Sequence, residues 1–305
     1  MAAESGQKPG HEPVLLEPVL DLLQPQGRKI LVDCTLGLAG HGRALLEAAG
    51  PEATLIGLDV DETNLRRSRE TLDRFGGRAR LFIANFSQLP EVLAEAGAAA
   101  ADLVLADLGV CSSQLDDPAR GLTFQQDGPL DMRLDPEGPT TAAELVNRTE
   151  EAELADTIYQ YGQERFSRRI ARAIVRARQD EPIRTTGRLA EIVRRAYPPQ
   201  ARRSRKGVDP ATRTFQALRI AVNDEMQHLE RLLTALPGCL ETGGRAGIIS
   251  FHSLEDGRVK RAFADWAASG NARILTKKPI VAEQTELQRN PRSRSAKLRV
   301  IQRVA

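Results

Sequence analysis

The chain has 305 residues, of which 41% are hydrophobic and 28% charged, and its formal net charge is +2. This composition is ordinary for a folded protein and excludes wholesale disorder. No apolar run approaches the roughly 18 residues that a membrane span requires, and the N-terminal segment lacks the apolar stretch of a secretory signal. We expect a soluble, cytoplasmic protein of about two domains, with no membrane partner.

The first third of the chain alternates short apolar runs with amphipathic segments. Near-continuous apolar runs between helices are typical of a parallel sheet that is covered on both faces. Similar runs return near the C-terminus, so we expect an α/β fold with about seven strands. The predicted strands are Lys29–Thr35, Thr54–Val60, Arg80–Phe86, Ala101–Val110, Arg245–Phe251, Ala272–Thr276 and Lys297–Val304.

Between the fourth and fifth strands the pattern becomes helical. After an ordered loop, the apolar spacing predicts three helices and then one long helix; these are Thr149–Tyr161, Glu164–Arg178, Gly187–Ala196 and Asp209–Leu236. We therefore expect residues 1–114 and 214–305 to form a sheet domain and residues 115–213 an inserted helical domain. A capping box formed by Ser253 and Asp256 predicts the start of a further helix.

Positive charge is concentrated in two parts of the chain. From Arg165 to Arg213 there are fifteen Lys or Arg and four Asp or Glu, a local balance of +11, and the rest of the chain sums to −9. From Arg289 to Ala305 there are six basic residues and no acidic one. Segregated charge of this kind indicates a polyanionic partner. A solvated surface in a protein where arginine outnumbers lysine 36 to 7 is the alternative.

Cysteine and histidine are too sparse for a disulfide framework or a structural zinc site. Cys34, Cys111 and Cys239 lie far apart, no CxxC pair occurs, and the four histidines are scattered. We expect free thiols and no metal.

A loop of small residues follows the first predicted strand. Its segment Gly37–His41 would let the backbone approach a ligand closely at the start of a helix. The second strand ends at Asp59 and Asp61, where a carboxylate can accept both hydrogens of a ribose diol. A tight turn explains the loop equally well when it is taken alone. The loop and the acidic strand end together favour an adenosine-containing cofactor.

NAD(H) and S-adenosylmethionine both fit this layout. The loop departs from the G-x-G-x-x-G dinucleotide pattern, and Asp102 and Asp107 add acidic groups on the fourth strand. Carboxylates attract a sulfonium or an amine and repel phosphates, which favours S-adenosylmethionine and methyl transfer. The loop Asp107–Asp116 should face the reactive methyl, because ligands bind at the carboxyl ends of such strands. Capping of the next segment is the alternative role for this loop.

Eight stretches of distinctive sequence occur in order and cover nearly the whole chain. They are HEPVLLEPVL (His11–Leu20), VDCTLGLAGH (Val32–His41), DLGVCSSQLD (Asp107–Asp116), RGLTFQQDGPLDMRLD (Arg120–Asp135), YGQERFSRRIARAIV (Tyr161–Val175), DPATRTFQALRIAVNDE (Asp209–Glu225), GGRAGIISFHSLED (Gly243–Asp256) and NPRSRSAKLRV (Asn290–Val300). Together these stretches resemble the RsmH/MraW family of small-subunit ribosomal RNA cytosine-N4 methyltransferases.

The resemblance implies a class I, Rossmann-like methyltransferase that uses S-adenosylmethionine and carries an inserted all-helical, RNA-facing domain. The implied substrate is N4 of a cytidine in the decoding centre of 16S rRNA, within the small ribosomal subunit. Phe86 and Gln114 enter the cofactor site from the resemblance alone, and Ala39 stands where the family usually has glycine. Carried over by position, the cofactor contacts are Ala39, Gly40, His41, Asp59, Phe86, Asp107 and Gln114.

RNA contacts are expected from arginines in three basic segments. Five arginines of the predicted helix Glu164–Arg178 recur at helical spacing with few acidic residues one turn away. The others lie in the basic linker Tyr197–Val208 and in the C-terminal segment Arg292–Arg299. The candidates are Arg165, Arg168, Arg169, Arg172, Arg202, Arg203, Arg205, Arg292 and Arg294.

The amino nitrogen of cytosine is a poor nucleophile, because its lone pair is delocalised into the ring. Methyl transfer to it needs in-line placement and acceptors for the amino hydrogens. Many amino-methyltransferases use an Asn/Asp-Pro-Pro-aromatic turn, whereas this chain has Asp107-Leu108-Gly109-Val110. We expect positioning to dominate, with backbone carbonyls near Gly109 as acceptors. Asp107 and Ser113 are the catalytic candidates, and the pattern identifies no general base.

Three other readings stay open at this point. A methyltransferase for another substrate would not need the segregated positive charge. A non-catalytic factor that binds S-adenosylmethionine and clamps immature small subunits would bind without forming product. A dehydrogenase would bind NAD. The sequence defines no oligomeric state.

Overall fold

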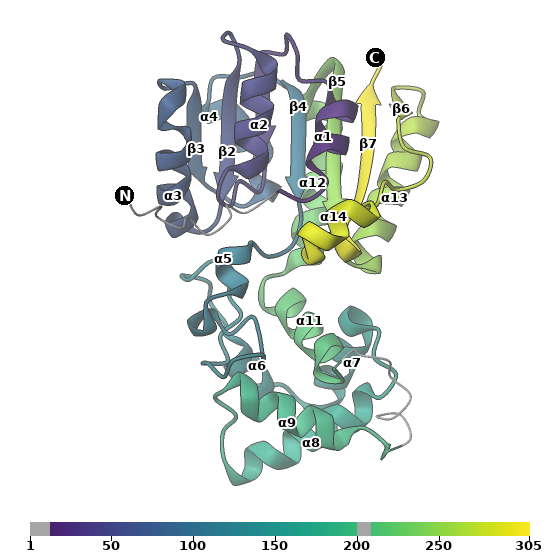
Figure 1. Cartoon of the computed structure of the whole chain (residues 1–305). Coiled ribbons are helices and arrows are strands. Elements are labelled where there is room, and N and C mark those ends of the chain that lie inside the picture. Colours follow the sequence, from purple (N-terminus) through teal and green to yellow (C-terminus); the bar gives the residue numbers. More distant parts are fainter. Residues whose placement is uncertain (1–12, 200–208) are drawn as a thin grey trace, which may run out of the picture. The chain divides into compact units, whose positions relative to one another are not determined.

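The computed structural model describes residues 13–199 and 209–305, and the chain divides into two compact units (Figure 1). The first unit comprises Met1–Gly109 and Gln227–Ala305, and the second comprises Val110–Met226. The second unit is therefore wider than the expected insertion 115–213. It includes helix α11 (Ala211–Val222), which packs against α7 (Glu151–Gly162) and α9 (Thr186–Ala196). Every helix in the described ranges is too short or too polar to cross a membrane.

A seven-stranded sheet forms the centre of the first unit, as the apolar runs predict. The strand order is β3-β2-β1-β4-β5-β7-β6. Strands β1 to β5 pair in parallel, and β7 runs antiparallel to both β5 and β6. The strands are β1 (Ile30–Asp33), β2 (Thr54–Asp59), β3 (Ala79–Ile83), β4 (Ala101–Asp107), β5 (Leu240–Ser250), β6 (Ala272–Ile274) and β7 (Lys297–Arg303).

Both faces of this sheet are buried, which explains why the central strands are apolar at nearly every position. Successive side chains of a strand point to opposite faces. Leu31 of β1 and Leu103 of β4 accordingly join one hydrophobic cluster, whereas Val32 and Val104 join the other. Helices α1 (Leu16–Leu23), α2 (Gly40–Ala49) and α3 (Glu62–Leu72) cover the first face, and α4 (Leu89–Glu95), α12 (Glu225–Cys239) and α13 (Ser253–Ala268) cover the second.

The second unit is helical, with a separate hydrophobic core. Its core residues include Leu154, Ile158, Ile170 and Ile174, whose spacing follows the predicted helical faces. The segment before these helices is an ordered loop with short helical turns. The elements are α5 (Ser112–Leu115), η3 (Pro118–Arg120), α6 (Ala142–Arg148), α7 (Glu151–Gly162), α8 (Ser167–Asp180), α9 (Thr186–Ala196) and α11. Shorter elements of the first unit are η1 (Asp73–Phe75), η2 (Phe86–Gln88), α14 (Gln284–Arg289) and η4 (Pro291–Ser295).

The prediction of one long helix over Asp209–Leu236 is wrong. The segment forms α11 and α12, with a break at Asn223 and Asp224, where Asp224 adopts a left-handed φ of 46°. The Asn223 side chain accepts a hydrogen bond from Leu134 N (2.7 Å) and donates one to Met132 O (2.8 Å). These tertiary bonds fix the interruption, and the apolar spacing on either side carries no sign of them.

Candidate functional site

The carboxyl ends of three adjacent strands each carry an aspartate. Asp33, Asp59 and Asp107 are the last residues of β1, β2 and β4, which lie in the order β2-β1-β4. Alternate residues of a strand point to the same face. On its strand, each aspartate lies two or four residues after a leucine that packs under α1, α2 and α3, so the three aspartate side chains share that face; the leucines are Leu31, Leu55 and Leu103. The strand order reverses between β1 and β4, the place where open α/β sheets bind ligands.

The loop after β1 brings its backbone close to this edge. Gly37 and Ala39 both adopt left-handed conformations, with φ of 55° and 62°, and Gly40 begins α2. A β-carbon on Gly40 would stand 2.6 Å from Pro13 Cγ, so only glycine fits there. Ala39 accepts a conformation that glycine adopts at less cost.

Asp59 ties the first loop to the end of β2. Its carboxylate accepts hydrogen bonds from Gly37 N and Asp61 N, both at 2.8 Å, and from the Asn64 amide at 3.3 Å. Burial raises the pKa of Asp59 to about 6, against the lowering effect of these hydrogen bonds. The Asn64 amide also lies 3.4 Å from the other carboxylate oxygen, so Asp59 organises the loop through both of its oxygens.

Asp107 is half-buried and has one unsatisfied oxygen. Its Oδ1 is shielded from solvent and has no hydrogen-bond partner among the described residues. Its Oδ2 lies 3.6 Å from His41 Nδ1, while His41 Nε2 donates to Val14 O at 2.8 Å. Burial, with smaller contributions from the carboxyls of Asp33 and Glu255, raises the pKa of Asp107 well above its usual range. A positively charged ligand would remove that penalty.

Asp33 is a site residue that sequence reasoning did not select. It is 1% exposed, and burial raises its pKa to about 7, with Asp59 adding to the rise. Its carboxylate accepts a hydrogen bond from Thr35 N at 3.2 Å. An acidic residue at the end of an otherwise apolar strand is the signal that could have identified it.

We predict that Asp33→Asn stabilises the ligand-free protein more at pH 8 than at pH 5. The raised pKa means that the folded state holds a proton between about pH 4 and pH 7 that the unfolded state has lost. Stability from this group is therefore lost as pH rises through that range, and asparagine avoids the loss. The gain in unfolding free energy at pH 8 should be about 2–4 kcal/mol. Denaturant titrations at both pH values test this, with the exposed Asp73→Asn as the control; an equal gain at both pH values would contradict it.

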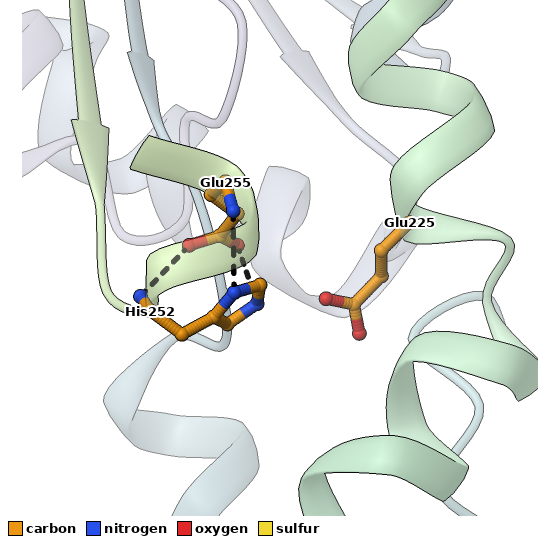
Figure 2. Close-up of side chains that lie close together, drawn as sticks. All are labelled: Glu225, His252 and Glu255. Carbon is orange, nitrogen blue, oxygen red and sulfur yellow. Dashed lines mark hydrogen bonds and ion pairs between the residues drawn. The ribbon is translucent and has the colours of Figure 1, made fainter. Parts of the chain in front are cut away.

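Helix α13 begins one residue earlier than the capping box Ser253/Asp256 predicts, so that prediction is wrong. His252 is the N-cap, and the reciprocal partner is Glu255 (Figure 2). Glu255 is 2% exposed and accepts hydrogen bonds from Phe251 N (2.8 Å) and His252 N (3.2 Å). The imidazole of His252, and not the expected hydroxyl of Ser253, accepts the capping hydrogen bond from Glu255 N. Asp256 instead forms an ion pair with Arg299 at 2.7 Å.

Figure 2 also labels Glu225, which belongs to the second unit. Its carboxylate accepts two hydrogen bonds from Arg219, from Nε at 2.7 Å and from Nη2 at 2.9 Å. This bidentate pair connects the end of α11 to the start of α12.

Phe86 lies beyond the end of β3, at the start of η2. Its ring meets His228 edge to face, with centroids 6.2 Å apart, and the adjacent Ser87 Oγ lies 2.9 Å from His228 Nδ1. Asn85 caps the turn in a capping box with Gln88. A half-buried ring is thus held in a defined position at the same edge of the sheet as Asp59.

The remaining candidates near β4 belong to the second unit. Gln114 Oε1 accepts a hydrogen bond from Cys111 N at 3.2 Å, and Ser113 Oγ lies 2.7 Å from Cys111 Sγ. These contacts order the turn that leads into α5. They add no test of the roles expected for Ser113 and Gln114.

The arginine candidates divide into exposed and paired groups. Arg165, Arg168, Arg169 and Arg172 are exposed on or beside α8, and Arg172 pairs with Glu151 of α7 at 3.3 Å. Arg292 and Arg294 are exposed in η4, whereas Arg299 of the same basic segment is buried against Asp256. The expectation that the whole segment Arg292–Arg299 contacts RNA therefore needs correction at Arg299. Three candidates lie outside the described residues: Arg202, Arg203 and Arg205.

The acidic edge fits a cationic cofactor. The buried carboxyls of Asp33 and Asp59 and the half-buried carboxyl of Asp107 lie on one face, and Asp107 Oδ1 has no partner among the described residues. A sulfonium and an ammonium group would relieve this burial of negative charge, whereas the phosphates of a dinucleotide would increase the repulsion.

The sheet order, the antiparallel β7 and the acidic edge define a class I, Rossmann-like methyltransferase fold, whose cofactor is S-adenosylmethionine. The chain belongs to the MraW methylase family, whose pattern matches residues 8–304.

Relatives of the chain share nearly its full length. It is 48% identical to ribosomal RNA small subunit methyltransferase H of Solidesulfovibrio magneticus, over 97% of this chain and 96% of that protein. It is 44% identical to the protein of the same name from Syntrophobacter fumaroxidans, over 98% of each chain. The solved structure of NSun6 from Pyrococcus horikoshii is 12% identical, with a TM-score of 0.46, over 100% of this chain and 57% of that one. Because this sequence identity and TM-score are low, the fold is assigned from the strand order of the chain itself.

Proposed function

We propose that the protein transfers a methyl group from S-adenosylmethionine to N4 of a cytidine in the decoding centre of 16S rRNA, within the small ribosomal subunit. Membership of the MraW methylase family and near-full-length relatives named for small-subunit ribosomal RNA methylation support the reaction class and the RNA. The structural observation that carries the proposal is the half-buried Asp107, whose shielded Oδ1 has no partner among the described residues, at the point where the strand order reverses.

The cofactor would be held along the edge from β3 to β4. The backbone of Ala39 and Gly40 would approach it, Asp59 would accept the ribose hydroxyls, and the ring of Phe86 would lie against the adenine. Asp107, oriented by His41, would receive the positively charged methionine end, and Gln114 would complete the set. Adjacent strands lie about 4.8 Å apart, so β3 and β4 are separated by about 14 Å, which suits an adenosine and a methionine moiety end to end.

The bound cofactor supplies an electrophilic methyl on a sulfonium sulfur. The protein has to place the amino nitrogen of cytosine in line with that methyl and to accept its hydrogens as the nitrogen becomes tetrahedral. The backbone carbonyl of Gly109 and the hydroxyl of Ser113 would accept hydrogen bonds from these N–H groups. As the N–CH3 bond forms and the S–CH3 bond breaks, the surplus amino proton would leave to water. The target base must also leave its stack, at a cost of roughly a few kcal/mol.

Ser113→Ala should lower turnover by roughly tenfold or more and leave cofactor affinity unchanged, since the acceptor is needed only as the nitrogen changes geometry. Single-turnover rates and calorimetric titration with the cofactor measure the two effects. Cys111→Ser, which keeps a polar partner for Ser113, serves as the control. A near-normal rate for Ser113→Ala would remove this residue from the mechanism.

The exposed arginines of α8 and η4 would contact the phosphates of the RNA, together with Arg202, Arg203 and Arg205. The four arginines on or beside α8 are exposed, and Arg172 also pairs with Glu151. The alternative of a solvated surface predicts no dependence of RNA affinity on these side chains.

Methyl-labelled cofactor tests which macromolecule is the acceptor. Small subunits lacking the modification, naked 16S rRNA and total cell protein are offered separately to the purified enzyme. Label in the rRNA of the subunits supports the proposal. Label in protein would contradict the proposal and show that the substrate is a protein. Tight cofactor binding without transfer to any of the three would indicate a non-catalytic binding factor.

A further inference from the structure

The loop after β4 lacks an aromatic residue, and the neighbouring strand places one beside it. Phe251 directly follows β5, and Leu108 N donates to Ile249 O at 2.9 Å, which holds the ends of β4 and β5 together. Asp107 is paired in register with Ile249. Two residues further along each chain, Gly109 therefore comes opposite Phe251.

The ring of Phe251 lies against the backbone of Gly109. A β-carbon built on Gly109 would stand 3.3 Å from Phe251 Cδ2, slightly closer than an ordinary van der Waals contact, and 3.8 Å from Cε2. Gly109 also has a φ of 109°, which side-chain-bearing residues rarely adopt. The backbone conformation favours glycine here, and the ring packs directly against the space that a β-carbon would occupy.

The position of Phe251 is fixed from two sides. Its N–H donates to the buried Glu255 Oε2 at 2.8 Å, and its ring packs against the cluster that contains Leu298 and Ile249. The side chain is nevertheless only half-buried. An aromatic ring that is held by its backbone and by one surface, with the remainder open, is suited to receive a planar partner.

Strand order gives the ring a defined place relative to the cofactor. Phe86 follows β3, Asp59 ends β2, Asp33 ends β1, Asp107 ends β4, and Phe251 follows β5. If the cofactor extends from β3 to β4 with its methionine end at β4, the sulfonium that bears the methyl lies between the adenosine and methionine parts, toward β4. The next strand along the edge, about 4.8 Å further, is β5, which Phe251 follows. A base that approaches the methyl from the β5 side would lie beside this ring.

We propose that Phe251 is the surface on which the target base stacks while its amino nitrogen receives the methyl group. This inference rests on the proposed function and specifies the substrate side of the same site. Flipped and single-stranded bases are held by stacking on aromatic side chains, an interaction that tolerates any base and orients its plane. Phe251 binds the substrate, and Glu255 acts through it as a positioning residue.

The main test compares Phe251→Leu with Phe251→Tyr. Leucine keeps apolar packing and removes the flat ring, so kcat/KM for small subunits should fall roughly 10- to 100-fold. Cofactor affinity and the melting temperature should change little, and Phe251→Tyr should restore most of the activity. Phe75→Leu, in the same hydrophobic cluster but before β3, is the matched control. An unchanged kcat/KM for Phe251→Leu, or an equal loss of cofactor affinity, would overturn the inference.

A second measurement does not depend on methyl transfer. The chain has one tryptophan, Trp266, so Phe251→Trp in a Trp266→Phe background provides a single reporter. Cytidine monophosphate, added with S-adenosylhomocysteine present, should quench it saturably, whereas ribose 5-phosphate should not. Phe75→Trp in the same background should show no quenching by either. Absence of quenching at position 251 would overturn the inference, even if the parent enzyme proves active. If the parent enzyme transfers no methyl, the proposed function fails, and this titration still decides whether the ring binds a base.

Discussion

Asp107→Asn should weaken the binding of S-adenosylmethionine by roughly 10- to 100-fold, the loss expected when a charge-assisted contact becomes a neutral one. The carboxyl is half-buried at the switch point of the sheet, its shielded Oδ1 has no partner among the described residues, and its pKa is raised well above its usual range. A cation that pairs with the carboxylate would offset the free-energy cost of keeping its negative charge away from water. Isothermal titration with the cofactor measures the effect.

The same substitution should not destabilise the ligand-free protein at neutral pH, because asparagine carries no charge to bury. This separates lost binding from misfolding. Asp102→Asn, on the opposite end of β4, is the matched control. Asp102 accepts hydrogen bonds from Lys29 N and Ile30 N, far along the strand from Asp107. Cofactor affinity that is equal in Asp107→Asn and the parent would contradict the proposed role.

Replacing Arg165, Arg168 and Arg169 together by alanine should lower the affinity for the RNA substrate roughly 100-fold at moderate salt. These side chains are exposed, and each is expected to neutralise a phosphate. The dependence of log affinity on log salt should become shallower by about two to three units, since each lost contact removes about 0.7–0.9 of slope. Filter binding across a salt series measures both quantities.

A control for total charge is available in the first unit. Arg66, Arg67 and Arg69 are also exposed and also lie on one helix, α3. Alanine at these three positions removes the same charge from another surface. If both triple variants lose affinity equally, the positive charge acts non-specifically and the α8 face is not a defined RNA interface.

The sheet was predictable because strands that are buried on both faces are apolar at nearly every position, and such runs are visible in the sequence. All seven strands occur where those runs lie, although β3 ends at Ile83 and β4 at Asp107, before the predicted limits. Helices with a one-sided apolar face, such as α8, were equally visible. The break between α11 and α12 was not, because Asn223 is held by hydrogen bonds to Met132 and Leu134, far away in sequence.

Parts of the candidate site that depend on local backbone conformation could be predicted from the sequence. Contacts between side chains from separate strands could not. Gly37 and Gly40 marked the loop, and the acidic end of β2 marked Asp59. Asp33 has the same local signal as Asp59, an acidic residue at the end of an apolar strand. The pair formed by Phe251 and Gly109 depends on strand order and register, which no local pattern encodes. The cap formed by His252 was missed because imidazole is an uncommon N-cap.

The most direct test of the central claim is the identity of the methylated nucleoside. Small subunits that lack the modification are incubated with the purified enzyme and labelled S-adenosylmethionine, and the rRNA is digested to nucleosides and separated by mass spectrometry. The proposed function predicts label in N4-methylcytidine and in no other nucleoside. Label in 5-methylcytidine, or in a purine, would contradict the assignment of the acceptor atom, while the fold and the cofactor would stand.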